Sequence, residues 1–276
     1  TTDDQFLRRY NISNDDVLET EIYAERFEKR DYFAVRGFGF QDLRISSKDI
    51  DQPDILPEIT YSHVSDPGST FGGRYSLDGS ILSLRRAGEG QDVTRGLVQG
   101  GWRRQSVFPF GVVLDTQALA RADIFNVRDR DIPPGATNRS DTETEGRLFA
   151  ALHNILRYPF IKSFQTSQII MEPLIALTLA PDINQRDDEI PNEDSQDVEL
   201  DVTSIFNVNR FPGQDRIEDK SRVTYGLNSG IYNDEGSQAR FFVGQSHTFD
   251  EKGSTFPEGS GLSEQDSDLV GRIGVQ

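Results

Sequence analysis

The side chains best placed to do chemistry lie in the segment 206–219, which contains closely spaced opposite charges around a Pro212–Gly213 turn. The charged members of this segment on which we concentrate are Arg210, Asp215, Arg216 and Glu218. Guanidinium and carboxylate groups form short, directional hydrogen-bonded pairs. We therefore predict that these four residues pair with one another and give the loop its structure, and that they perform no reaction.

Other signatures of catalysis or metal binding are missing. The histidines are His63, His153 and His247, and none has a second histidine at ligand spacing, which argues against a histidine-based metal site. Ser246 and His247 are neighbours in a strand-like stretch, where adjacent side chains point to opposite faces, so they make a poor nucleophile and base. The sequence predicts no catalytic residue, no cofactor and no metal site, and hence a protein that is not an enzyme.

The segment 182–201 is strongly acidic, with Arg186 as its single basic residue. It does not fit a calcium-binding loop, because Arg186 and Asp187 stand where an oxygen ligand and a glycine are required. A solvated surface loop and a diffuse attraction for divalent cations both stay open. The net charge of -17 argues against nucleic acid as a partner, and the absence of cysteine excludes disulfides and thiolate metal sites.

The segment 110–125 shows what kind of element must position such side chains. Its apolar residues fall on one parity, namely Phe110, Val112, Leu114, Ala118, Ala120, Ala122 and Ile124, while Asp115, Gln117, Arg121 and Asp123 fall on the other. A β-strand places these two sets on opposite faces, and its length exceeds the usual 5–6 residues of a soluble strand. We predict that Asp115, Gln117, Arg121 and Asp123 face the lumen of a barrel, and that Val112, Leu114, Ala118 and Ala120 face lipid.

Similar alternation recurs along the chain and predicts about eleven long strands. They cover residues 18–27, 32–41, 56–64, 74–85, 93–103, 110–125, 147–157, 169–180, 222–232, 239–249 and 268–275. The four longest connections all fall on alternate gaps, so an antiparallel meander gathers them at one end and the tight turns at the other. Outer-membrane barrels sort their loops in this way. The predicted fold is all-β, an antiparallel up-and-down meander forming an incomplete part of a large transmembrane outer-membrane β-barrel.

Several motifs resemble the barrel domain of the LPS-assembly protein family LptD, also called OstA or Imp. They are Asn192-Glu193-Asp194-Ser195-Gln196-Asp197, the run from Asn209 through Arg210-Phe211-Pro212-Gly213 to Asp219, and Arg222-Val223-Thr224-Tyr225-Gly226-Leu227. The strand start at Leu56-Pro57-Glu58-Ile59 and the segment Met171-Glu172-Pro173-Leu174 are similar to further landmarks. The resemblance covers nearly the whole chain, and its character suggests an alphaproteobacterial member.

The resemblance implies a component of the translocon that inserts lipopolysaccharide into the outer leaflet of the Gram-negative cell outer membrane. It also implies an LptE-like lipoprotein plug and periplasmic Lpt bridge components as partners. Residues 1–276 would then be part of one outer-membrane β-barrel domain, without the N-terminal jellyroll and without the first and last barrel strands. Eleven strands make an incomplete wall, because such barrels reach about 26 strands.

Three other functions stay open at this point. A general outer-membrane porin, or another β-barrel channel, shares the strands and the loop sorting and lacks only the loop motif. An outer-membrane lipase or deacylase needs a nucleophile and a base on one face, and a soluble β-rich binding module needs no lipid-facing side. The segment 206–219 is predicted to be an extracellular connection, because the turn 233–236 after the next strand is tight, as periplasmic turns are.

Overall fold

The computed structural model describes residues 9–11, 15–43, 52–86, 90–129, 142–183, 190–195, 198–250 and 256–276. Its strands are β1 (Val17–Glu28), β2 (Asp31–Asp42), β3 (Asp54–Val64), β4 (Arg74–Arg85), β5 (Asp92–Val107), β6 (Val113–Arg128), β7 (Glu143–Arg157), β8 (Phe160–Ser163), β9 (Ser167–Leu179), β10 (Arg222–Asn233), β11 (Gln238–Thr248) and β12 (Val270–Val275). A short 3-10 turn, η2 (Pro109–Gly111), joins β5 to β6. No helix within the described part of the chain is long and apolar enough to cross a membrane.

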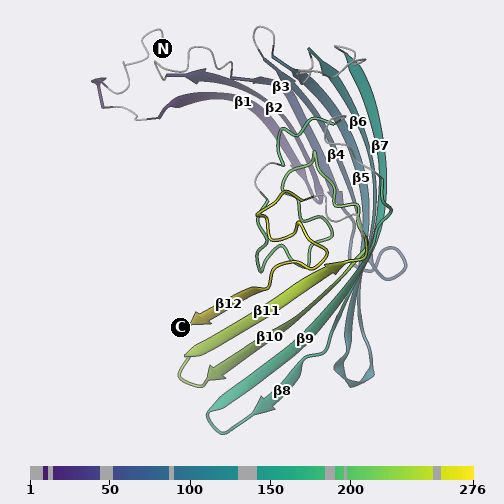
Figure 1. Cartoon of the computed structure of the whole chain (residues 1–276), viewed down its shortest axis with the longest axis vertical. Helices are drawn as coiled ribbons and strands as arrows, with labels where there is room; N and C mark the ends of the chain where they lie inside the picture. The colour runs from purple at the N-terminus through teal and green to yellow at the C-terminus, as the bar shows by residue number, and fades with distance from the viewer. Residues whose placement is uncertain are drawn as a thin grey trace. The chain divides into compact units, whose positions relative to one another are not determined.

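The strands follow one another through a single 12-stranded sheet, in the order β1-β2-β3-β4-β5-β6-β7-β9-β10-β11-β12, with β8 paired to β9 (Figure 1). Neighbouring strands are antiparallel in pairs such as β1 with β2 and β9 with β10. In the described residues the path runs from β1 to β12 without returning to β1. The predicted antiparallel meander, forming part of a larger barrel, is therefore confirmed.

The chain forms two compact units whose boundaries pass through β4, β5, β6 and β7. The first unit comprises Thr1–Ser65, Ser76–Gly100 and Arg121–Arg147, and the second comprises Asp66–Tyr75, Gly101–Ala120 and Leu148–Gln276. The first contains the β1–β2 hairpin, in which Ile22 lies opposite Gly37. The segment 181–221, which holds the loop charges, belongs to the second.

In the second unit the two faces of the sheet have opposite character. One face is exposed and apolar, and its large residues are Leu148, Leu152, Leu156, Met171, Ile175, Leu177, Leu179, Tyr225, Ile231, Phe241, Ile273 and Val275. The other face is covered and rich in polar or small side chains, namely Ala151, His153, Ala176, Thr178, Arg222, Thr224, Ser246 and Thr248. Strand alternation in the sequence produces this separation, because successive side chains point to opposite faces.

The structure corrects the sequence-based boundaries in three places. Phe110 was placed inside a strand, but it lies in η2 with a left-handed backbone (φ 68°), and β6 begins at Val113. The apolar parity extends back through Phe110, so the pattern hid the turn. Strand β8 lies inside the predicted connection 158–168, and β5 continues to Val107 instead of ending at Arg103. Residues 148–152 are part of strand β7, in agreement with the predicted strand 147–157.

Candidate functional site

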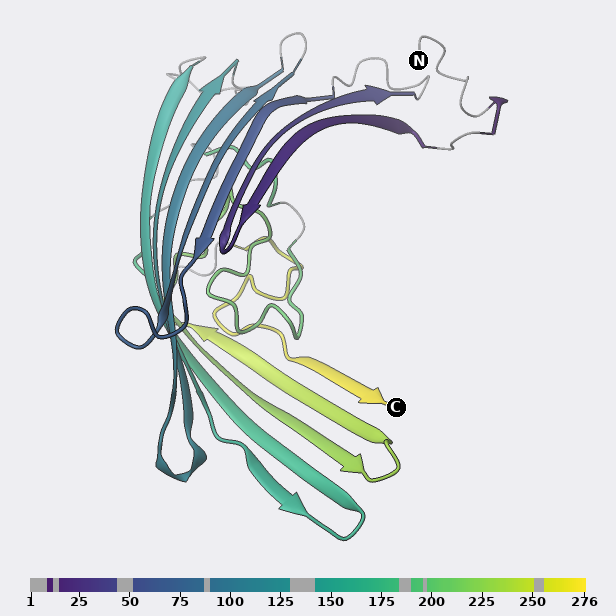
Figure 2. The same cartoon turned by 180° about the vertical axis from the view of Figure 1, so that it is seen from behind.

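The candidate site consists of the described residues 190–195 and 198–221, which belong to the connection between β9 and β10 in the second unit. Ser221 closes its base, because its Oγ accepts a hydrogen bond from the Ala180 N–H at 3.1 Å and donates one to the Ala180 carbonyl at 2.9 Å. Ile217 is 2% exposed and packs on Phe149 and Ala151 of the covered face. Figures 1 and 2 show this segment, drawn in green, together with the yellow segment that precedes β12.

Two glycines of the sheet give the segment a place to dock. Gly226 and Gly244 lie opposite one another on β10 and β11. A Cβ at Gly226 would lie 3.3 Å from the Phe206 ring, and one at Gly244 would lie 3.4 Å from Ile205. Ile205 has no exposed surface. The glycine pair therefore lets the apolar start of the segment approach the backbone of the sheet closely.

Two parts of the segment are fastened to each other by carboxylates that accept backbone N–H groups. Asp215 Oδ2 accepts from the N–H groups of Glu193 and Asp194, at 2.7 and 3.1 Å. In return, Asp194 Oδ1 accepts from the N–H groups of Gln214 and Asp215, at 2.9 Å each. Such charge-assisted hydrogen bonds are stronger than neutral ones. The residues 192–195 and 211–216, which carried the resemblance in the sequence, thus form one interlocked structure.

Gly213 is required by this interlock. Its backbone is left-handed (φ 68°), and a Cβ there would lie 2.4 Å from both the carbonyl oxygen and Oδ1 of Asp194. No side chain larger than hydrogen fits at that separation. The Pro212–Gly213 turn therefore serves both the chain reversal and the close approach of Asp194.

Asn209 closes the second half of the loop. Its Oδ1 accepts hydrogen bonds from the N–H groups of Phe211 (3.4 Å) and Glu218 (3.0 Å). Its Nδ2 donates to the carbonyl of Arg216 at 3.1 Å. Arg216 is buried, and its own N–H donates to Ser195 Oγ at 3.3 Å. One amide side chain thus replaces the backbone pairing that these residues lack outside a strand.

A buried ion-pair cluster lies where the segment meets β10. Arg210 Nε donates to Glu218 Oε2 at 2.9 Å, and its Nη2 also pairs with Oε1 of the same carboxylate. Arg222 Nη1 lies 3.1 Å from Glu218 Oε1, and its Nη2 donates to the carbonyls of Asn207 and Val208. All three charged side chains are at most 2% exposed. Two guanidinium groups share one carboxylate, and the carbonyls supply the further acceptors that buried cations need.

A third set of charges fixes the return of the chain to the sheet. Lys220 Nζ pairs with Asp182 at 2.9 Å and with Asp250 at 2.8 Å. Burial by itself would lower the pKa of Lys220, but its hydrogen bonds with Asp250 and Asp182 outweigh burial, and the pKa is raised. Next to it, burial raises the pKa of the Asp219 carboxyl, despite the nearby Lys220 and a 3.0 Å hydrogen bond from the Ile183 N–H.

The segment 256–262 packs against the same loop. The rings of Phe211 and Phe256 are stacked with centroids 4.1 Å apart, and Leu262 completes this buried cluster. The Arg210 guanidinium lies 5.4 Å from the centroid of Phe256. Aromatic packing and a cation–π contact therefore join two segments that are far apart in the sequence.

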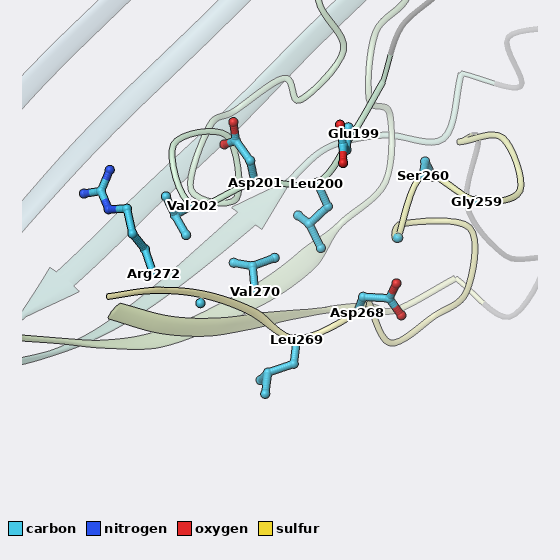
Figure 3. A pocket seen from close by; sticks show the side chains of 12 residues that line it. Glu199, Leu200, Asp201, Val202, Gly259, Ser260, Asp268, Leu269, Val270 and Arg272 are labelled. Carbon is cyan, nitrogen blue, oxygen red and sulfur yellow. The ribbon is translucent and has the colours of Figure 1, made fainter. Parts of the chain in front are cut away.

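An open pocket of ≈ 450 Å³ lies between the segments 199–202, 259–261 and 268–272 (Figure 3). Glu199, Asp201 and Asp268 are its acidic lining residues. Asp201 caps a turn, because its Oδ1 accepts from the N–H groups of Thr203 and Ser204 at 2.6 and 2.8 Å. The side-chain hydrogen bond from Thr203, followed by the Ser204 N–H, lowers the pKa of Asp201. No group of three potential metal ligands was found among the described residues.

The four residues predicted from strand β6 have different surroundings. In the first unit, Asp123 is buried and accepts from Arg121 Nε and Arg147 Nε, each at 2.8 Å. In the second, Asp115 is buried and pairs with Arg157 Nη2 at 2.5 Å. Gln117 is only half-buried. All four occupy the parity opposite to the exposed Ala120, and whether that parity faces a barrel lumen stays a prediction.

The four residues predicted from the loop all lie within the interlocked structure. Arg210 pairs with Glu218, as expected for the loop charges. Asp215, in contrast, binds the backbone N–H groups of Glu193 and Asp194. Three further residues of the site were missed by sequence reasoning, namely Asp194, Asn209 and Arg222. For Asn209 the useful signal was an Asn close to a Pro–Gly turn, where such side chains bind backbone N–H groups. Asp194 and Arg222 carried no comparable local signal.

The histidines do not form a common site. His63 Nδ1 lies 2.8 Å from Asp31 in the first unit, while His247 Nδ1 lies 2.7 Å from Asp266 in the second. His153 is buried and its Nδ1 lies 2.8 Å from Thr178 Oγ1. The site therefore offers a dense set of mutually paired charges that can hold a loop in one conformation.

The two faces of the second unit identify the class of protein. A soluble sheet buries its apolar face, whereas here the apolar side is exposed and the polar side is covered by the interlocked loop. An apolar face this large on the outside of an antiparallel meander is characteristic of membrane β-barrel walls.

Residues 1–276 match the family model described as LPS transport system D, and the chain belongs to the LptD family. It is 23% identical over 230 residues to the LPS-assembly protein LptD of Acinetobacter baumannii, covering 79% of this chain and 27% of that protein. It is 33% identical over 107 residues to the protein of the same name from Acidovorax sp., covering 38% of this chain and 13% of that protein. The aligned parts are thus a minor share of these relatives.

Proposed function

We propose that the protein to which residues 1–276 belong inserts lipopolysaccharide into the outer leaflet of the Gram-negative cell outer membrane. This chain would supply part of the wall of its barrel domain. The observation that supports the proposal most directly is the family match over all of residues 1–276. The sheet of the second unit supports it independently. Its exposed apolar face and covered polar face suit a wall between hydrocarbon and a polar interior.

The physical chemistry of the substrate fits such a wall. Lipopolysaccharide combines phosphorylated sugars, which need a polar route, with acyl chains, which need hydrocarbon. On this proposal Asp115, Gln117, Arg121 and Asp123 face the lumen, and the exposed parity of the same strand faces lipid. The interlocked loop stays on the polar side and shapes the interior. The proposal assigns the chain no catalytic step.

The partners that we propose are inferred from membership of the LptD family. Lipopolysaccharide must be delivered from the periplasm, so we include periplasmic Lpt bridge components and an LptE-like lipoprotein plug among the partners. The described residues of the loop are fixed by bonds within the chain, such as that between Asp194 and Asp215. The loop would therefore offer a partner a preformed surface.

Conditional depletion of the full-length protein tests the function. Newly made lipopolysaccharide should fail to reach the cell surface, as measured by its accessibility to an externally added modifying enzyme. Re-expression of the wild-type protein should restore surface delivery. Surface delivery that continues after depletion, together with ion conductance of the reconstituted protein, would replace the proposal with a general porin.

A further inference from the structure

Two hairpin turns of the second unit place a phenylalanine where the backbone favours asparagine or glycine. In the turn 70–73, Phe71 and Gly72 have φ of 49° and 71°, and the Gly73 N–H donates to the Thr70 carbonyl at 2.8 Å. In the turn 108–112, Phe110 and Gly111 have φ of 68° and 86°. Tight turns with two left-handed residues usually contain Asn-Gly, and a bulky residue there is strained.

The rings in these two turns point into solvent. Phe71 is 85% exposed and Phe110 is 92% exposed. The turn around Phe71 is also held in place, because Trp102 Nε1 donates to the Thr70 carbonyl at 3.0 Å and Arg104 Nη1 donates to the Phe71 carbonyl at 3.1 Å. A strained residue whose ring packs so little inside the chain suggests that the ring serves a contact outside it.

The turn containing Phe110 lies beside a second exposed aromatic segment, the connection from β7 to β9. A Cβ at Gly111 would lie 4.0 Å from the Tyr158 ring, and the rings of Tyr158 and Phe160 have centroids 4.3 Å apart. Phe160 and Phe164 are each 49% exposed, and Ile161 between them is 60% exposed. Figures 1 and 2 both show the β5–β6 turn nearer to the start of β8 than to its end.

Basic side chains are interleaved with these rings. Lys162 is exposed, and its Nζ lies 5.3 Å from the centroid of Phe164. Arg104 is also exposed, and its Nη1 donates to the carbonyl of Phe71. The neighbouring turn between β10 and β11 has the opposite character, because Asp234 and Glu235 are exposed there without an aromatic residue.

We propose that the turns 70–73 and 108–112 and the segment 158–164, together the aromatic rim, insert into the headgroup layer of an anionic phospholipid leaflet. This inference rests on the proposed membrane location. Aromatic rings favour the boundary between hydrocarbon and water, and basic side chains are attracted to anionic headgroups. The rim also continues the exposed apolar face, since Leu156 at the adjoining end of β7 is 42% exposed.

The first test reports the environment of single labelled positions. Phe110→Cys, Phe164→Cys, Glu235→Cys and Leu148→Cys variants of the full-length protein, without other cysteines, receive an environment-sensitive fluorophore and are reconstituted into phosphatidylglycerol-containing vesicles. We expect headgroup-proximal quencher lipids to quench the labels at Phe110 and Phe164. We expect iodide in the water to quench these two labels roughly threefold less than the label at Glu235.

The label at Leu148, which is 77% exposed on the strand face, distinguishes failure of the aromatic rim from failure of the proposed membrane location. Lipid quenching at Leu148 with full iodide quenching at Phe110 would overturn the rim and leave the membrane location standing. Iodide quenching at both positions would overturn the membrane location and the rim with it. A label at Phe110 that is shielded from iodide but not quenched by lipid would mean that protein covers the rim, which also overturns the inference.

The second test separates membrane contact from turn stability. Because asparagine adopts the left-handed conformation more easily than phenylalanine, Phe110→Asn should fold in detergent with an unchanged or higher melting temperature. The same variant should lose roughly half or more of its yield of folded protein in phosphatidylglycerol vesicles. Lys162→Glu should lose yield there and keep it in phosphatidylcholine vesicles. Wild-type yields for both variants in phosphatidylglycerol vesicles would contradict the rim.

Discussion

Asp194 and Asp215 exchange hydrogen bonds through their backbones and side chains. The Asp215 N–H donates to Asp194 Oδ1 at 2.9 Å, and the Asp194 N–H donates to Asp215 Oδ2 at 3.1 Å. Each carboxylate accepts a further N–H from its partner's neighbour, Gln214 or Glu193. This exchange joins residues 21 apart in the sequence, and much of the site depends on it.

We predict that Asp194 and Asp215 act as one unit. Asp215→Ala should lower the free energy of unfolding in detergent by about 2 kcal/mol or more, because it leaves the N–H groups of Glu193 and Asp194 without their charged acceptor. Asp194→Ala should have a similar effect. The double variant should lose clearly less than the sum of the single losses, as measured by denaturant unfolding. Full additivity of the two losses would show that the residues act independently.

Gly213 and Gly236 offer a matched pair of substitutions, because both have positive φ in turns of the second unit. Gly236 has φ of 90° and nothing within 4 Å of a Cβ, so Gly236→Ala should show only the backbone penalty of about 1 kcal/mol. Gly213→Ala should cost clearly more, since its Cβ would lie 2.4 Å from Asp194. Melting temperatures in detergent check the difference, and equal losses would refute the close approach.

Glu218 is the single carboxylate between two buried guanidinium groups. Glu218→Gln should destabilise the fold by about 3–5 kcal/mol, because it leaves the charges of Arg210 and Arg222 uncompensated. The expected cellular result is a low level of folded barrel, measured by heat-modifiable mobility on gels. Glu258→Gln, at an exposed position, is the control and should leave the level unchanged. A normal barrel level with blocked lipopolysaccharide delivery would mean that the cluster handles substrate.

Asp219 predicts a pH dependence of stability. Burial raises the pKa of its carboxyl, so the folded state holds the proton more tightly than the unfolded state does. That contribution to stability is present below the unfolded pKa and is lost as the pH rises through the raised, folded pKa. Asp219→Asn should therefore gain stability relative to wild type as the pH rises from acid to neutral. Denaturant unfolding at a series of pH values checks this. A variant whose free energy of unfolding falls relative to wild type as the pH rises would contradict it.

The two faces of β6 can be compared by cysteine labelling of the full-length protein in membranes. Gln117 is half-buried on the predicted lumen parity, and Ala120 is exposed on the other parity. Gln117→Cys should react with a water-soluble maleimide, whereas Ala120→Cys should react only with a lipid-soluble reagent. Equal reaction of both positions with the water-soluble reagent would defeat the membrane-wall interpretation.

Much of the fold follows from local pattern. Alternation with a period of two is a property of each strand by itself, so β6, β9 and β10 could be found from their side chains alone. Because this pattern is local, it also misplaced the start of β6 and missed β8. The apolar parity of β6 continues through Phe110, and only the structure shows that the chain turns there. Strand β8 is four residues long, too short for alternation to be recognised.

The sequence by itself determined the strands, their antiparallel order, the family and the four charged residues of the loop. Only the tertiary structure decided their partners. Asp215 meets the N–H groups of residues 193 and 194, and Glu218 meets Arg222 at the start of β10, because the segment folds back on itself over the sheet. The contacts of Asp215 depend on loop closure over many residues and have no local signature. The Pro212–Gly213 turn was visible in the sequence, and the reason for its glycine is a carboxylate 19 positions away.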